Sequence, residues 1–340
     1  MNLWLLLTLP ALAECHHPAG RGARSCPDLC SCSSPPSEVS CSQRALTLFP
    51  ADGLSPNTTR LSIQSTGLTG VAAHHLSAVP LLKNLQLYHN NLTSLPSDLL
   101  RGVPRLNTLD LTGSQLVHLP PRVFNRSSLQ HLVLKNNLIA KVDAEWFPAD
   151  SGLIWLDLSG NRLTGVPSAP LLRLPRLQNL DLSHNHLQEL QPDALHHLHH
   201  LETLNLAGNK LVSLKPSAFT HNPKLSQLFL QENRLRDLPA TLLQGLRHLD
   251  LLLLNQNQLQ GLPAGFLRDG ESSVRVILTG NPWVCDERIE FLKKWLTLHP
   301  HNVIYPEEVT CSGPEALKHR QVVSLADSEL GLAKSDKTAN

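Results

Sequence analysis

Two groups of side chains in this sequence of 340 residues have the types and spacing to bind a metal ion. Cys26, Cys30, Cys32 and Cys41 have the spacing Cys-x3-Cys-x-Cys-x8-Cys, and four thiolates this close together are a possible zinc site. The segment His196-His197-Leu198-His199-His200 holds four imidazoles, which bind zinc and copper. The alternatives are disulfides for the cysteines and a polar surface segment for the histidines. We favour these alternatives and expect no metal and no cofactor.

The positions of the seven cysteines indicate disulfides at the two ends of one folded unit. No cysteine lies between Cys41 and Cys285, and Cys311 follows near the C-terminus. In an oxidising compartment this pattern favours disulfides that hold the two ends. Cys15 stands apart, and it is free, paired between chains or removed with a leader peptide.

Nothing in the sequence indicates catalysis. It has no Gly-rich phosphate loop, no nucleophile elbow and no His-Glu-x-x-His motif. Asp181, Ser183 and His184 are close in sequence, but neighbouring strand residues point to opposite faces and the turn residues are committed to their turn. We therefore expect no catalytic residue and no enzyme activity.

The N-terminus and the composition predict a secreted protein. Residues 1–13 hold the apolar run from Leu3 to Leu9 and then Ala11-Leu12-Ala13, which fits a signal peptide cleaved after residue 13 or a few residues later. A buried N-terminal strand is the alternative. No later stretch approaches the roughly 18–20 apolar residues of a membrane span. The formal net charge of +1 argues against a general nucleic-acid binder and a polybasic membrane-surface protein.

An internal repeat must position these side chains. Residues Leu153 to Leu163 read L-x-x-L-x-L-x-x-N-x-L, and ten units share this pattern at intervals of 24 residues, with one interval of 23 between Ser114 and Asn137. Thr66 and Ser114 replace the asparagine in two units. The asparagines of the other units are Asn90, Asn137, Asn161, Asn185, Asn209, Asn233, Asn257 and Asn281.

The chemistry of one unit predicts a solenoid. The L-x-L part is a short strand whose leucines point inward, and the residues between them point to a concave face. The asparagine amide bonds backbone groups inside the turn, so the turns at Thr66 and Ser114 should be looser. The proline-bearing return segments should be extended or form single helical turns. Stacked repeats bury the apolar side that one repeat leaves open.

The two ends of such a solenoid need caps, which sets the expected domains. Residues 14–25 are a linker, 26–57 an N-terminal cysteine cap, 58–280 the repeats, 281–325 a C-terminal cap and 326–340 a polar tail. In the C-terminal cap Ile289, Leu292, Trp295 and Leu296 recur at helical spacing. We expect Trp283 and Trp295 in the core of that cap.

The cap motifs and the repeats resemble secreted leucine-rich-repeat proteins. The stretches that carry the resemblance are Leu153 to Leu163, Gly280-Asn-Pro-Trp-Val-Cys285-Asp286 and Cys311-Ser-Gly-Pro-Glu-Ala-Leu317-Lys318. Within that family the chain is similar to the beta-type phospholipase A2 inhibitors of snake plasma and to leucine-rich alpha-2-glycoproteins. Most such C-terminal caps have a second cysteine where this chain has Glu287. The resemblance implies an α/β solenoid, a horseshoe with a parallel concave sheet and disulfide-bonded caps. It also implies the pairs Cys26–Cys32, Cys30–Cys41 and Cys285–Cys311.

The candidate partner-binding residues are those that point outward on the concave face. Asp110, Asp157 and Asp181 hold the same position in their repeats, and strands in one sheet lie about 5 Å apart, so Asp157 and Asp181 should be adjacent and repel each other. Arg60, Lys135 and Arg275 on the same face confine the acidic patch to the middle. Trp155 and Phe229 should add exposed aromatic area. The alternative is a solvated sheet face without a partner. The candidate set is Tyr88, Asp110, Trp155, Asp157, Asn179, Asp181, Asn205, Phe229 and Glu232.

Three sequons predict N-glycosylation, at Asn57, Asn91 and Asn125, and none lies on the concave sheet. The resemblance implies a circulating, non-catalytic glycoprotein of plasma whose acidic concave face binds and inhibits a basic secreted phospholipase A2. The alternative is a protein like leucine-rich alpha-2-glycoprotein, which the resemblance associates with cytochrome c and with growth-factor receptor signalling. A matrix structural protein is a third possibility. We expect a protein ligand, no nucleic acid, no membrane span and self-association as in the snake inhibitors.

Overall fold

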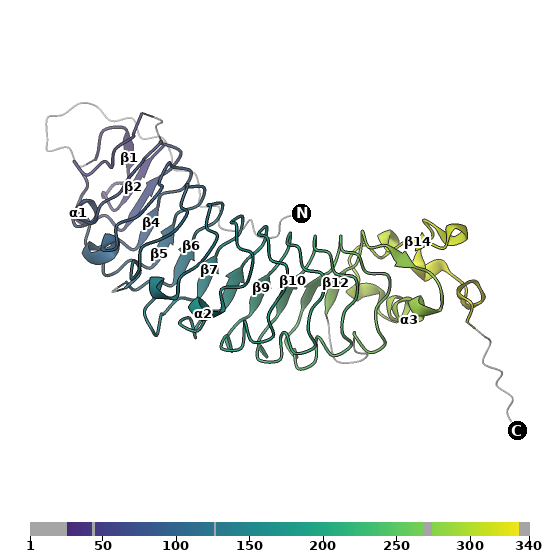
Figure 1. Cartoon of the computed structure of the whole chain (residues 1–340). Helices are drawn as coiled ribbons and strands as arrows, with labels where there is room; N and C mark the ends of the chain where they lie inside the picture. Colours follow the sequence, from purple (N-terminus) through teal and green to yellow (C-terminus); the bar gives the residue numbers. More distant parts are fainter. Residues whose placement is uncertain (1–25, 43–44, 126, 268–273, 333–340) are drawn as a thin grey trace, which may run out of the picture.

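The chain winds into a solenoid whose twelve short strands lie side by side in one curved sheet (Figure 1). A computed structural model describes residues 26–42, 45–125, 127–267 and 274–332. The expected signal peptide at 1–13, the linker at 14–25 and Cys15 lie outside the described residues. None of the described helices has the length and apolar character to cross a membrane.

Strand order in the sheet follows sequence order from β1 to β12. The pair β1–β2 is antiparallel, and every other neighbouring pair is parallel. The strands are β1 (Cys30–Cys32), β2 (Glu38–Cys41), β3 (Arg60–Ile63), β4 (Asn84–Gln86), β5 (Thr108–Asp110), β6 (His131–Val133), β7 (Trp155–Asp157), β8 (Asn179–Asp181), β9 (Thr203–Asn205), β10 (Gln227–Phe229), β11 (Leu251–Leu253) and β12 (Arg275–Ile277).

The register of the sheet confirms the repeat predicted from the sequence. Leu156 pairs with Leu180, and Leu180 pairs with Leu204, so residues 24 positions apart stack directly. All three leucines are at most 1 % exposed. The ten parallel strands from β3 to β12 supply one strand per repeat, and their inward leucines join those of the return segments in one aliphatic core.

The buried asparagines connect successive repeats. Asn161 donates from Nδ2 to the carbonyls of Leu134 at 2.9 Å, Leu158 at 3.0 Å and Ser159 at 3.2 Å. Its Oδ1 accepts a hydrogen bond from the Ile139 amide at 3.0 Å. This one side chain therefore satisfies four backbone groups that water cannot reach.

The two units without asparagine differ from each other. Thr66 is bonded from the next repeat, because its amide and its hydroxyl both donate to Asn90 Oδ1. The Ser114 side chain is buried, and its hydroxyl oxygen has no hydrogen-bond partner. Neither side chain is seen to bond the turn carbonyls as Asn161 does, but the Thr66 hydroxyl has a partner and the Ser114 hydroxyl has none.

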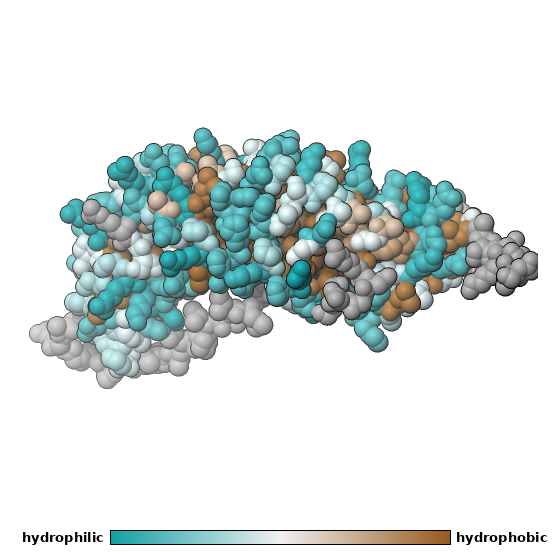
Figure 2. Space-filling view, turned by 90° about the horizontal axis from the view of Figure 1, so that it is seen from below, coloured by the Kyte–Doolittle hydropathy of each residue, from teal (hydrophilic) through white to brown (hydrophobic). Residues whose placement is uncertain are grey.

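The return segments on the convex side contain only short helical turns, as the proline-bearing pattern predicts. They are α1 (Ala73–Leu76), α2 (Ser168–Leu171) and the 3₁₀ turns Leu99–Gly102 and Ala144–Trp146. Figure 2 shows polar residues over much of the molecule in a view from below, with apolar patches between them.

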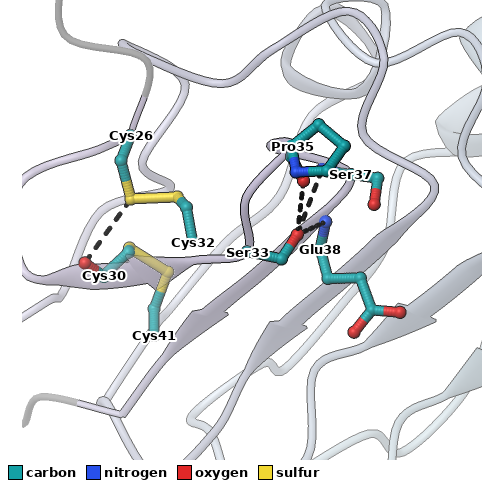
Figure 3. The surroundings of a disulfide bond; sticks show 8 residues. All are labelled: Cys26, Cys30, Cys32, Ser33, Pro35, Ser37, Glu38 and Cys41. Carbon is teal, nitrogen blue, oxygen red and sulfur yellow. Dashed lines mark hydrogen bonds between the residues drawn. A yellow bond between two sulfur atoms is a disulfide. The ribbon is translucent and has the colours of Figure 1, made fainter. Parts of the chain in front are cut away.

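The N-terminal cap continues the sheet and does not form a separate unit. The hairpin of β1 and β2 is held by the disulfides Cys26–Cys32 and Cys30–Cys41 (Figure 3). These are the pairs that the resemblance implies. The four cysteines are thus bonded to one another and not available as zinc ligands.

The C-terminal cap covers the last repeat. It contains α3 (Glu290–Leu298) and the two-stranded sheet of β13 (Trp283–Val284) and β14 (Cys311–Gly313), joined by the disulfide Cys285–Cys311. Trp283 and Trp295 are 0 % and 4 % exposed. The cap also reaches past the expected boundary at 325, since Leu330 is 2 % exposed in the 3₁₀ turn Asp327–Leu330.

Candidate protein-binding face

The outward side chains of the strands form two straight columns along the concave face. The register pairs the first residue of each strand with the first residue of the next, and likewise the third. From β5 to β12 the first column is Thr108, His131, Trp155, Asn179, Thr203, Gln227, Leu251 and Arg275, and the third-residue column is Asp110, Val133, Asp157, Asp181, Asn205, Phe229, Leu253 and Ile277. The third-residue column therefore changes from acidic at β7 and β8 to apolar at β10 to β12.

Asp157 and Asp181 are direct register partners on β7 and β8. Asp181 Oδ2 accepts a hydrogen bond from Asn205 Nδ2 at 2.9 Å. Asp157 Oδ1 accepts from the Ser159 amide at 2.8 Å and the Ser159 hydroxyl at 2.6 Å. No described residue donates a hydrogen bond to Asp157 Oδ2. One carboxylate oxygen of the pair is thus left for a partner.

The environment of Asp157 opposes its negative charge. Burial raises the pKa of its carboxyl, and the charge of Asp181 raises it further, to about 6. The hydrogen bonds from Ser159 and the charge of Lys135 lower the pKa and offset part of this rise. Above pH 6 the Asp157 carboxylate is held charged at an energetic cost, which a cation placed against it would reduce.

The cations on the same face leave this pair largely uncompensated. Arg60 pairs with Glu38 at 3.6 Å, and Arg275 pairs with Asp250 at 2.6 Å. Burial lowers the pKa of His131, the register neighbour of Trp155, which favours its neutral form. Of the described cations, Lys135 alone acts on the pKa of Asp157.

The column of acidic residues also has a structural role that the sequence interpretation missed. Asp110, Asp157 and Asp181 each accept a hydrogen bond from the amide two residues further on, and Asn205 does the same. Such side chains close the turn that follows the strand. The signal was visible as Asp or Asn at one fixed position of successive repeats.

Several members of the candidate set are less accessible than the sequence suggested. Phe229 is 4 % exposed, so the expectation that it adds exposed aromatic area is wrong. Asp181 and Asn205 are 7 % and 6 % exposed. Strands about 4.8 Å apart crowd the third-residue column on a concave surface. Trp155, Asn179 and Asp157 remain partly exposed on β7 and β8.

The other candidates lie apart from this centre. Asp110 is separated from Asp157 by Val133 on β6. Tyr88 follows β4 and is partly exposed. Glu232 is exposed on the turn after β10, where its φ of 58° is the left-handed conformation shared by that turn position in other repeats. The structure therefore brings together Trp155, Asn179, Asp157 and Asp181, and does not bring Tyr88, Asp110 or Glu232 to them.

The remaining sequence motifs lie outside the concave sheet. Asn57 and Asn91 are exposed, and Asn125 is partly buried. The four histidines from His196 to His200 are grouped with His221, whose ring centroid is 3.9 Å from that of His196. No group of three or more metal-ligating side chains with suitable geometry occurs among the described residues.

A family model described as leucine rich repeat matches residues 56–116, 104–163, 151–211 and 200–259. The chain belongs to the leucine-rich-repeat family. Its members present protein-binding faces on this solenoid, and the fold is typically not catalytic. The four matches together extend from β3 to the turn after β11 and include every strand of the candidate face from β5 to β11.

Two curated relatives match a short part of this leucine-rich-repeat chain. A phospholipase A2 inhibitor of Gloydius brevicaudus siniticus is 36 % identical over 53 residues, and a phospholipase A2 inhibitor beta of Elaphe climacophora is 34 % identical over 53 residues. Each match covers 16 % of this chain and 16 % of the relative, so the chain spans about a sixth of their length.

A solved structure matches nearly the whole chain. Human 5T4, also called Wnt-activated inhibitory factor 1 or trophoblast glycoprotein, superposes with a TM-score of 0.54 at 26 % sequence identity. The match covers 90 % of this chain and 98 % of that chain. It supports the solenoid with its caps as one continuous architecture.

Proposed function

We propose that this protein is a secreted, non-catalytic glycoprotein that inhibits a basic secreted phospholipase A2 by binding it on the concave face. The observation that carries the proposal is the pairing of Asp157 with Asp181 on adjacent strands, next to the partly exposed Trp155, with the Asp157 pKa raised to about 6. The short similarity to two phospholipase A2 inhibitors supports the choice of target.

The electrostatics favour a basic ligand. Two carboxylates on adjacent strands repel each other, and a lysine or arginine of a partner placed between them removes that repulsion while forming charge-assisted hydrogen bonds. Charge complementarity of this kind raises association rates and selects partners. The apolar end of the third-residue column, at Leu253 and Ile277, supplies further contact area three and four strands away from Asp181.

The test is inhibition of a basic secreted phospholipase A2 on lipid vesicles by the purified chain. We expect inhibition at or below micromolar concentration and about a tenfold loss or more for Asp157→Asn/Asp181→Asn. Asp110→Asn is the control, because Asp110 closes the corresponding turn of its own repeat but has no acidic register neighbour on β4 or β6. The charge-reversed pair Asp157→Lys/Asp181→Lys should weaken binding further.

Circular dichroism of each variant separates loss of binding from loss of fold. An unchanged affinity of the folded double variant contradicts the concave site. If the parent chain does not inhibit the enzyme, a basic secreted phospholipase A2 is not its target. Retention on immobilised cytochrome c, or on a growth-factor receptor ectodomain, without effect on the enzyme would assign the alternative resembling leucine-rich alpha-2-glycoprotein.

A further inference from the structure

Basic side chains gather on one flank of the solenoid, away from the concave face. In four consecutive repeats a basic residue or a histidine stands directly before the buried leucine that precedes the strand. These residues are Arg176, His200, Lys224 and His248. All four are exposed, whereas the leucines after them are at most 5 % exposed. We call these four residues, with Arg173 and Arg247, the basic flank.

The sheet places four residues of the basic flank in a straight row, namely Arg176, His200, Lys224 and His248. Arg176, His200 and Lys224 each lie three residues before the first residue of β8, β9 and β10, and those first residues are register partners. The backbone next to the row is regular too, since the Glu202 amide bonds the Gln178 carbonyl and the Ser226 amide bonds the Glu202 carbonyl, both at 2.8 Å. With strands about 4.8 Å apart, four repeats extend the row over roughly 15 Å.

Within the described residues, no carboxylate forms an ion pair with the permanent cations of the basic flank, which are Arg173, Arg176, Lys224 and Arg247. Two carboxylates lie near the row: Glu202 is exposed, and Asp250 is paired with Arg275. A chain of formal net charge +1 therefore carries the permanent cations Arg176 and Lys224 in this row, and Arg173 and Arg247 close to it in sequence.

Histidines extend the row toward the convex side. His197, His199 and His221 are exposed, and His199 Nδ1 lies 3.2 Å from the carbonyl oxygen of His221. The rings of His196 and His221 have centroids 3.9 Å apart. Asp193 and Glu202 are the acidic residues nearest to residues 196–200 in the sequence.

We propose that the basic flank binds linear sulfated polysaccharides of the glycosaminoglycan class. A row of cations at one spacing matches a polymer that carries sulfates at regular intervals, and binding releases counterions as with other polyanions. The positions of the flank contain no Phe, Tyr or Trp, so they lack the stacking platforms of proteins that bind single-stranded nucleic acid. The site lies away from the concave face and does not depend on its partner.

The test measures the salt concentration that elutes the full chain from immobilised heparin. We expect retention at pH 7.4 and elution as the salt concentration is raised. Arg176→Ser/Lys224→Ser/Arg247→Ser should lower affinity at least about tenfold in 0.15 M salt. These side chains are exposed, so the fold should be kept, and circular dichroism checks it.

The matched control is Arg162→Ser/Lys210→Ser/Arg234→Ser, which removes the same charge from the opposite flank of the same repeats. There the acidic residues Glu189, Glu232 and Asp237 are interspersed. An equal loss in both triple variants, or no retention of the parent chain at pH 7.4, overturns the proposal. Equally tight binding to hyaluronan, which carries carboxylates only, or to oligo-dT also overturns it.

Discussion

Asp157 and Asp181 stand side by side on adjacent parallel strands, and each closes its own turn through one oxygen. The two carboxylates thus serve the fold of each repeat while opposing each other across repeats. The predictions that follow separate these two roles and test the contacts that hold the solenoid.

Replacing Asp157 by Asn should stabilise the protein at high pH. Its pKa is raised from 3.8 to about 6, so between pH 4 and 6 the folded chain binds more protons than the unfolded chain. The free energy of unfolding therefore falls as the pH rises through this window. Asp157→Asn removes that loss while keeping an acceptor for Ser159, and should gain about 1–2 kcal/mol at pH 7.5 and almost nothing at pH 4.

Denaturant unfolding at both pH values measures this difference. Asp110→Asn is the control, since its register neighbours Gln86 and Val133 carry no charge. A gain for Asp157→Asn that is equal at pH 4 and pH 7.5 would show that the buried charge of Asp157 is not its cause.

Ser114→Asn should stabilise the turn after β5. An asparagine there would offer Nδ2 to the carbonyls of Leu87 and Leu111, and Oδ1 to the Leu92 amide, as Asn161 does in its own repeat. It would also replace a buried hydroxyl that has no partner. We expect about 1–2 kcal/mol in the free energy of unfolding. Removing such an asparagine, as in Asn161→Ala, should lower the free energy of unfolding by about 3 kcal/mol or more. A Ser114→Asn variant less stable than the parent chain would contradict the argument.

The disulfides should differ in their contribution to stability. Cys285–Cys311 closes 26 residues and Cys26–Cys32 closes 6. Loop-closure entropy predicts a loss of about 3–4 kcal/mol for Cys285→Ala/Cys311→Ala and about 2 kcal/mol for Cys26→Ala/Cys32→Ala. Calorimetry of the two double variants compares them directly, and the opposite order would show that cap packing outweighs chain entropy.

Gly160→Ala should destabilise the chain by about 1–2 kcal/mol. Gly160 has a φ of 66°, and an added Cβ would meet the side chain of Asn136 and lie 3.3 Å from its backbone nitrogen. Gly165 is the control, because an added Cβ there meets no atom within 4 Å. Thermal unfolding of both alanine variants measures the difference, and equal midpoints would contradict the strain.

The repeat was predictable because it is encoded in the spacing of residues along the chain and does not depend on contacts between distant residues. Leucine spacing fixed the register from Leu156 to Leu204, and the asparagines fixed the turns. The C-terminal helix was predictable from the spacing of its apolar residues, and α3 buries Leu292, Trp295 and Leu296.

The accessibility of the concave side chains was not predictable from the same pattern. Strand alternation assigns Phe229 to the outward face, yet on the curved sheet it lies between Asn205 of β9 and Leu253 of β11 and is 4 % exposed. The pairing of Asn205 with Asp181 was likewise hidden, because it depends on distances across strands. Alternation gives the direction of a side chain and not the space around it.

The sheet ends differently from most open sheets. At one edge β1 is only three residues long and is held by the disulfides Cys26–Cys32 and Cys30–Cys41, and at the other a backbone bridge from Val303 lies against Val276 of β12. Neither edge therefore offers another chain a long, regular row of free amides and carbonyls. A one-layer sheet with so many aliphatic residues would be a template for fibril growth, and these short, restrained ends limit the backbone from which such growth could begin.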